Sequence, residues 1–189
     1  MSVDFATQRA TMVETQVRTA DVTDYAIQDA MRRAPREALL PPEKAYLAYA
    51  DVEVEYAPGR WLLKPRDVAK LLQVLRPRPG ERALAIAAPY AAIVMEAMGL
   101  VVTRLDQGDL TQPQGEYDIV VCEGAVSSTP PGWCAALAVG GRLGAVERKG
   151  PVGRALLFLK SEHGVGRRDL FDCGPPTMAG FEPQPAFAF

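Results

Sequence analysis

The sequence has few of the residues on which hydrolases and metal sites depend. It contains one histidine, His163, and three widely separated cysteines, Cys122, Cys134 and Cys173. His163 lies in the segment SEHGVGRR, which predicts a turn between strands. These counts argue against a histidine-based nucleophilic enzyme, a zinc site and a disulfide framework. We expect buried, reduced thiols, as in a cytoplasmic protein.

An excess of one charge and long apolar runs are also missing. The formal net charge is −2 and there is no basic run, so we expect neither a nucleic-acid partner nor an anionic membrane surface. No apolar run approaches the length of a membrane span. The amino-terminal stretch MSVDFATQRATMVETQ lacks the pattern of a signal peptide. The 189 residues, 48% of them hydrophobic, suffice for one globular unit with a sizeable core.

Apolar residues at helical spacing dominate the first part of the chain. We predict helices over 5–17, 23–34 and 41–51, and a fourth that begins at Pro65 and ends before the group RPRPGE. Thr23 is the predicted N-cap of the second helix, and Pro35 ends it. We therefore assign 1–78 to an amino-terminal helical region that packs on the remainder.

From Arg82 onward, short apolar strands alternate with loops and helices. The parallel strands are predicted in ALAIA, LVVTRLD and EYDIVVCEGA, and antiparallel strands in RLGAVERK, RALLFLKS and RRDLFDCG. Helices are predicted in YAAIVMEAM and in PPGWCAALA, the second one ending at Gly140-Gly141. This order predicts an α/β domain over 79–189. We expect the proline-rich end to be partly extended, with Phe181, Phe187 and Phe189 free to pack on the body.

Several segments, taken in order, resemble the protein-L-isoaspartate O-methyltransferase family. They are APREALLPPEKAYLAYAD, GRWLLKPRDVAKLLQVL, PGERALAIA and EYDIVVCEGAVSSTPPGWCAALAVGGRLGAV. The resemblance implies a Rossmann-like class I methyltransferase sheet with a helical extension at the amino terminus. It also implies methyl transfer from S-adenosylmethionine to the carboxylate of isoaspartyl residues in damaged proteins.

The loop after the first strand departs from the family. Family members have an acidic residue, isoleucine and Gly-x-Gly-x-Gly, whereas this chain has Ala85-Ile86-Ala87-Ala88-Pro89 followed by Tyr90. Each alanine adds a Cβ that resists positive φ, and the proline lacks an N–H donor. We expect Tyr90 and the alanines to fill the space that a cofactor would occupy.

The sheet also lacks room for its full set of elements. Between Ala87 and Asp118 the family has a helix, a strand, a second helix and a third strand, whereas this chain has the length of one βαβ unit. We therefore expect a sheet truncated by one helix and one strand, which leaves LVVTRLD at its edge. Asp106 ends that strand, either as a ribose-binding carboxylate or as a solvated strand end. Glu123 lies near the cofactor side of the sheet, or else faces water.

The segment expected to bind the substrate is altered as well. The resemblance places a hydroxyl residue, at the centre of the isoaspartyl carboxylate pocket, at the position of Leu63. Leucine can neither bind nor orient a carboxylate. Arg60 and Lys64 either attract one or are solvated loop charges.

These departures favour a catalytically impaired or inactive family member. The candidate cofactor-binding residues, by family equivalence or nearby position, are Ala87, Pro89, Asp106 and Glu123. No catalytic residue is assigned and no metal is expected. We expect S-adenosylmethionine not to be bound, and a scaffold that forms a homodimer or binds a protein through the exposed sheet edge or the amino-terminal helices. The alternatives are an active carboxyl methyltransferase and an unrelated small-ligand enzyme that reuses the cleft, for which no polar cluster is apparent.

Overall fold

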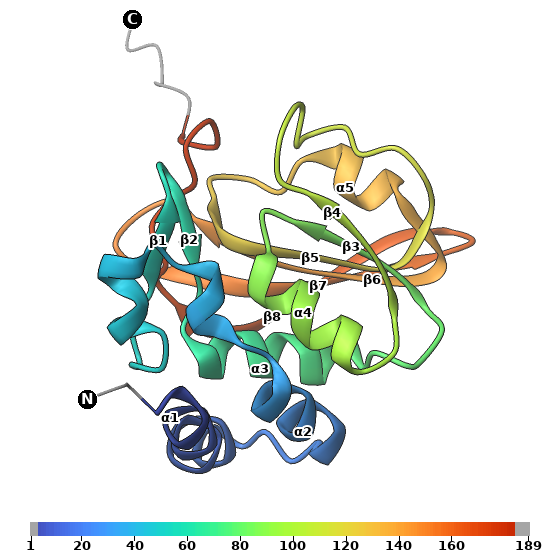
Figure 1. Cartoon of the computed structure of the whole chain (residues 1–189). Coiled ribbons are helices and arrows are strands. Elements are labelled where there is room, and N and C mark those ends of the chain that lie inside the picture. The colour runs from blue at the N-terminus through green and yellow to red at the C-terminus, as the bar shows by residue number, and fades with distance from the viewer. Residues whose placement is uncertain (1–3, 184–189) are drawn as a thin grey trace, which may run out of the picture.

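The computed structural model describes residues 4–183, which contain a mixed six-stranded sheet with α1–α4 on one side and the short α5 on the other (Figure 1). The strand order is β4-β3-β5-β6-β7-β8. The first four strands in this order are parallel, and β7 and β8 continue the sheet in antiparallel fashion. Their bounds are β3 Arg82–Ile86, β4 Val101–Leu105, β5 Tyr117–Val126, β6 Leu137–Arg148, β7 Gly153–Ser161 and β8 Gly164–Cys173. The predicted α/β class is confirmed.

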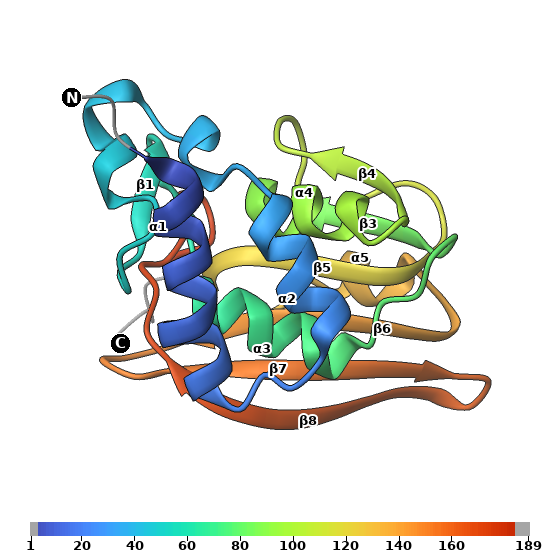
Figure 2. The ribbon, with the colours of Figure 1, turned by 60° about the horizontal axis from the view of Figure 1, so that its bottom comes forward.

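Four helices cover one face of the sheet (Figure 2). They are α1 Phe5–Met12, α2 Tyr25–Arg33, α3 Pro65–Leu75 and α4 Pro89–Ala97. One cluster of buried side chains joins them to the strands, with Ile27 from α2, Leu72 from α3 and Val121 from β5. Residues on both sides of position 78 therefore share this core, and the division at that position stays a prediction.

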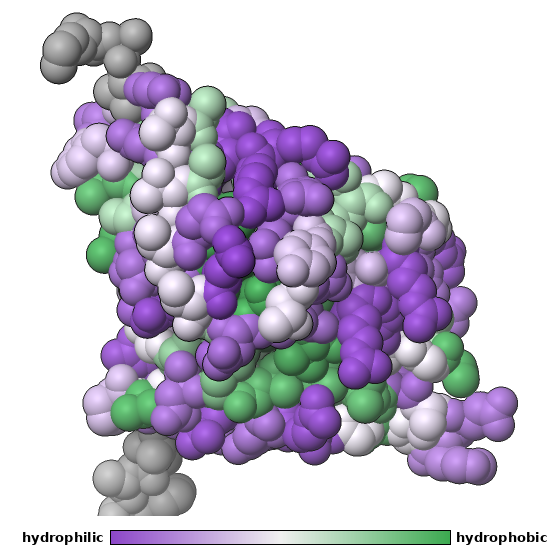
Figure 3. Space-filling view, turned by 90° about the horizontal axis from the view of Figure 1, so that it is seen from below, coloured by the Kyte–Doolittle hydropathy of each residue, from purple (hydrophilic) through white to green (hydrophobic). Residues whose placement is uncertain are grey.

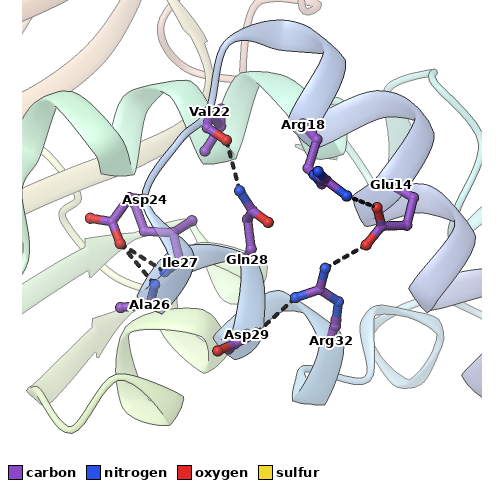
Figure 4. A network of polar contacts seen from close by, with 9 residues as sticks. All are labelled: Glu14, Arg18, Val22, Asp24, Ala26, Ile27, Gln28, Asp29 and Arg32. Carbon is purple, nitrogen blue, oxygen red and sulfur yellow. Dashed lines mark hydrogen bonds and ion pairs between the residues drawn. The ribbon is translucent and has the colours of Figure 1, made fainter.

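Helix α1 is extended by one π-helical stretch, Val13–Val17, and a 3₁₀ turn, Arg18–Ala20. The predicted N-cap of α2, Thr23, is wrong by one position. Asp24 caps the helix, because its carboxylate accepts from the amides of Ala26 at 2.9 Å and Ile27 at 3.3 Å (Figure 4). The Thr23 amide instead donates to the side chain of Gln73 at 2.7 Å, which holds this residue outside the helix.

A polar network joins the turns of α1 and its extension to α2. Glu14 accepts from both Arg18 and Arg32, and Arg32 also donates to Asp29 at 2.7 Å (Figure 4). Gln28 donates to the Val22 carbonyl at 2.9 Å below this network. The ion pairs are largely exposed and stabilise the fold little, so their main effect is to orient one helix on the other.

Two 3₁₀ helices and a hairpin connect α2 to α3. The 3₁₀ helices are Arg36–Leu39 and Pro42–Leu47, and the second lies within the short helix predicted over 41–51. The hairpin consists of β1 Val54–Ala57 and β2 Arg60–Leu62. Proline at the first position of α3 then starts the helix that carries the Val68, Leu71, Leu72 and Leu75 stripe into the core.

The helix predicted over 130–138 is only one turn, α5 Pro131–Ala135. The two glycines do not end it but lie inside β6, where the register against β5 shifts. Gly140 has φ +83°, and a Cβ on Gly141 would meet the Ala138 carbonyl at 2.8 Å. Glycine is therefore required where the pairing of β6 with β5 becomes irregular. The helix α5 leads into β6 almost directly.

The connection between β4 and β5 contains no helix or strand in residues 106–116, all of which the structure describes. Leu110 from this loop enters a second buried cluster on the opposite face of the sheet, and Trp133 of α5 donates to its carbonyl at 2.6 Å. The predicted truncation is confirmed. As expected, β4 lies at the sheet edge, with β3 as its neighbour.

The segment that follows β8 runs back along the carboxyl end of β5. The Met178 amide donates to Ala125 at 2.8 Å, and the Ala179 amide donates to Gly59 at 3.1 Å. The Phe181 ring lies 5.8 Å from that of Trp133, as expected for a packed tail. Phe187 and Phe189 lie outside the described residues.

His163 lies in the turn between β7 and β8, as predicted. None of the helices within residues 4–183 combines the length and the apolar character needed to cross a membrane. All three cysteines are free thiols, and Cys122 and Cys173 are buried.

Candidate functional site

The carboxyl ends of the parallel strands β3, β4 and β5 meet at one edge of the sheet, the edge where open α/β sheets bind ligands. The four predicted positions all lie at this edge. The amide of Ala87 donates to the carbonyl of Leu105 at 3.0 Å, and Pro89 opens α4, whose Ala91 amide donates to Glu123 at 2.6 Å. Asp106 follows β4 directly.

The loop between β3 and α4 retains a backbone suited to glycine. Ala87 has φ +43°, in the left-handed region, where a Cβ costs about 1 kcal/mol or more. Its neighbour Ala88 has φ −129°, an ordinary value. Both side chains, together with those of Pro89 and Tyr90, are buried. The loop therefore carries methyl groups and a ring into the protein interior.

Glu123 is completely buried, so its predicted alternative as a strand-end carboxylate facing water is wrong. One oxygen, Oε1, accepts from the Ala91 amide at 2.6 Å, and Oε2 accepts from the Leu63 amide at 3.3 Å. Ala91 lies in the first turn of α4, where unpaired amides and the helix dipole favour an anion. The carboxylate thus links the amino end of α4 to the segment before α3.

Burial raises the pKa of Glu123 to about 7, because a carboxylate loses solvation in the interior. The guanidinium of Arg36 and the nearby backbone amides oppose this shift. The other titratable groups that interact with this carboxylate are the phenols of Tyr56 and Tyr90 and the thiol of Cys122, all with pKa values raised mainly by burial. The proton occupancy of Glu123 therefore changes near neutral pH.

Arg36 is the buried cation of this region. It donates to the carbonyls of Ala48 at 2.8 Å and Leu63 at 2.6 Å, and its guanidinium carbon lies 4.6 Å from the centre of the Tyr90 ring. Within residues 4–183, its Nη1 atom and the Tyr90 hydroxyl have no hydrogen-bond partner, although both atoms are buried. Burial lowers the pKa of the Arg36 guanidinium. The cluster therefore retains two polar atoms with unused hydrogen-bonding capacity.

Asp106 differs from Glu123 in its surroundings. Its side chain is exposed, and partial burial of the carboxyl nevertheless raises its pKa, against the effect of Arg104. In the described part of the chain, no hydrogen bond or ion pair holds this carboxylate. Asp106 is thus a solvated acid at the end of β4.

In the segment expected to bind the substrate, Arg60, Leu63 and Lys64 each contact a different part of the protein. The Leu63 side chain is buried, and its amide and carbonyl bond Glu123 and Arg36. Arg60 donates to the Ala179 carbonyl at 2.9 Å, and Lys64 lies 3.8 Å from Glu53. Both cations therefore have partners in the protein.

Sequence reasoning missed that Glu123 and Arg36 are buried. For Glu123 a signal existed, because the buried residues Val121 and Ala125 lie two positions away on the same face of β5. For Arg36 no local signal existed, since its place is fixed by contacts with residues 12 and 27 positions away.

Other parts of the surface contain hollows. One of about 510 Å³ is lined by Ser127, Ser128, Lys149, Gly180, Phe181, Glu182 and Pro183, and one of about 310 Å³ lies between α1 and Tyr46 and Tyr49. Neither hollow includes any of the four predicted positions. Across the described residues there is no group of three or more metal-ligating side chains.

Comparison with known proteins identifies sequence relatives of this chain. The chain matches no protein-family model. It is 33% identical to a protein-L-isoaspartate O-methyltransferase of Methylorubrum populi, with 90% of this chain and 92% of that protein aligned. It is 32% identical to the enzyme of the same name from Methylorubrum extorquens, over 93% of this chain and 88% of that protein.

Solved structures agree with these relatives in fold. One is a beta-aspartate methyltransferase from Plasmodium falciparum in complex with S-adenosyl-L-homocysteine, with a TM-score of 0.74, 16% identity, and 90% of this chain and 97% of that chain covered. A second protein-L-isoaspartate O-methyltransferase has a TM-score of 0.68 and 18% identity over 92% of this chain and 67% of that chain. Since these sequence relatives are more than 30% identical over nearly their whole length, the chain belongs to the protein-L-isoaspartate O-methyltransferase family.

Proposed function

We propose that this chain is a protein-L-isoaspartate O-methyltransferase relative that has lost tight binding of S-adenosylmethionine and acts as a scaffold for a protein partner. The observation that carries the proposal is the amino end of α4, whose amide at Ala91 is taken by the buried carboxylate of Glu123. In dinucleotide- and nucleotide-binding folds, this end of the helix faces the ligand.

The residues at this edge do not fit the cofactor as a glycine loop would. Close approach of a ligand to the backbone requires positions without Cβ, but Ala87 and Ala88 carry methyl groups that are completely buried. Pro89 adds a ring and has no amide to donate. Tyr90 is completely buried beside Arg36.

The second candidate function is an active S-adenosylmethionine-dependent methyltransferase that acts on isoaspartyl residues of proteins. Two observations favour it. The relatives above 30% identity bear the name of that enzyme, and one structural neighbour was solved with S-adenosyl-L-homocysteine. Asp106 also keeps an exposed carboxylate at the end of β4, where an acid would hold ribose hydroxyls.

Calorimetry with S-adenosylmethionine and S-adenosylhomocysteine distinguishes the two candidates. The scaffold proposal predicts no binding tighter than about 100 µM, which corresponds to about −5.5 kcal/mol. The relative from Methylorubrum populi, measured beside it, shows whether the assay detects binding in this family. Tighter binding by this chain, together with methylation of an isoaspartyl peptide, would establish the active enzyme.

We place the binding surface at the edge of β4 or on the amino-terminal helices. The partner is either a second copy of this chain or another protein. The edge strand has one neighbour in the sheet and exposes Val101, with 63% of its surface accessible. The helical side presents a hydrophobic stretch framed by hydrophilic side chains (Figure 3). A strictly monomeric species in sedimentation at micromolar concentration would exclude the homodimer. The free thiols support a place in the reducing cytoplasm.

A further inference from the structure

The carboxyl group of Glu123 is held by fixed hydrogen-bond donors. Two backbone amides from separate segments, Leu63 before α3 and Ala91 in α4, each donate to a different oxygen of the same group. Backbone donors are fixed in place by the fold, so their convergence does not depend on the side chain that they bind. Removing the Glu123 side chain would therefore leave the donors close to their present positions.

A buried cation accompanies these donors. Arg36 is completely buried, and its attraction for Glu123 lowers the pKa of that carboxyl. Its Nη1 atom has no hydrogen-bond partner among the described residues, and neither has the Tyr90 hydroxyl beneath the guanidinium. A buried guanidinium with a free N–H is costly unless an anion or water satisfies it. The guanidinium therefore favours negative charge in this region, although Glu123 does not bond its free N–H.

We propose that the amides of Leu63 and Ala91 form a carboxylate seat, in the field of the nearby guanidinium of Arg36, that Glu123 occupies from within the protein. This inference rests on the proposed function in one respect, since it treats the strand ends as closed to an external cofactor. In this chain the carboxylate at Leu63 is internal.

The direct test is to vacate the seat and refill it. Glu123→Ala removes the carboxylate and leaves the two amides without an acceptor, so the thermal midpoint should fall by roughly 5–10 °C at pH 8. Sodium formate, the smallest carboxylate, should then bind. With a Kd of about 20 mM, formate at about 200 mM raises the midpoint by roughly 3–5 °C.

Matched controls separate the seat from general salt effects. Sodium chloride at the same ionic strength should leave the midpoint of Glu123→Ala unchanged. Glu123→Gln fills the seat with a neutral amide and should not respond to formate. Asp67→Ala also removes a buried acid, but its carboxylate accepts no backbone hydrogen bond from residues 4–183 and should not create a formate site. Equal responses to formate in all three variants, or none in Glu123→Ala, would overturn the proposal.

A second measurement does not require Glu123→Ala to fold. In the wild-type protein, the amide proton resonances of Leu63 and Ala91 should titrate together, with a midpoint near pH 7, because both amides donate to one carboxylate. The same titration should be missing in Glu123→Gln. Independent midpoints for the two amides, or no titration, would count against a shared carboxylate. Neither test involves the cofactor, so calorimetry can refute the scaffold while the seat stands, or the reverse.

Discussion

The carboxyl ends of β3 and β5 differ sharply from that of β4, although the three strands are parallel neighbours. At β3 and β5 the loop residue Ala87 and the acid Glu123 are completely buried, and the acid has fixed donors. At β4 the acid Asp106 is exposed and has no partner in the described chain. An acidic side chain that is exposed to solvent needs no partner in the protein. A buried acidic side chain needs hydrogen-bond donors and a nearby cation to offset its lost solvation.

The largest expected effect comes from removing the buried cation. Arg36→Ala removes two hydrogen bonds from a charged donor, the contact with Tyr90 and the nearby positive charge that favours ionised Glu123, so the free energy of unfolding should fall by about 3–5 kcal/mol. Arg104→Ala is the matched change at β4, where the exposed pair with Glu96 contributes about 1 kcal/mol at most. Urea denaturation measures both. Similar losses for the two variants would remove the distinction between the strand ends.

The pH dependence of stability tests the buried acid. Since the pKa of Glu123 is raised from 4.5 to about 7 in the folded state, the folded chain binds a proton that the unfolded chain does not bind between these values. Stability conferred by this group is therefore lost as pH rises from about 4.5 to 7, by about 3 kcal/mol in total.

Denaturant unfolding at pH 5 and pH 8 measures this effect. Glu123→Gln cannot titrate and should lack that loss, while Asp106→Asn should keep it, because the exposed carboxylate of Asp106 is screened by water. The idea fails if wild type and Glu123→Gln lose the same stability between the two pH values.

The smallest effect concerns the loop before α4. Ala87→Gly relieves the left-handed strain at φ +43° but loses a buried methyl group, so we expect a change in unfolding free energy within about 1 kcal/mol of zero. Ala88→Gly has no strain to relieve at φ −129° and should destabilise by about 0.5–1 kcal/mol or more. Chemical denaturation of both variants provides the comparison. A larger loss in Ala87→Gly than in Ala88→Gly would show that the strain is negligible.

The fold could be predicted largely because its signals are local. Apolar runs located most of the strands, proline marked the start of α3, and the short sequence between LVVTRLD and Asp118 predicted the missing helix and strand. The N-cap and the glycines of β6 were misplaced because neighbouring residues compete for the same role. Thr23 and Asp24 are both good caps, and the contact with Gln73 decides between them.

The carboxylate seat could not be predicted because its parts come from three distant segments. Arg36, Leu63 and Ala91 are adjacent only after α3, α4 and the sheet have assembled. The one available clue was the alternation in β5, which places Glu123 on the face that buries Val121. A charged residue in a buried register indicates a partner elsewhere in the chain, but does not identify it.

The short connection between β4 and β5 also bears on how fast the sheet assembles. β3 can pair with β5 only after the chain between them has formed a closed loop. In this chain the pairing joins Ala83 to Ile119. An additional helix and strand would lengthen that excursion by about 30 residues, and each doubling of a loop adds about 0.6 kcal/mol of closure entropy. Since folding rates fall as contacting residues become more distant in sequence, this chain should form its parallel half sooner than relatives with the complete set of elements.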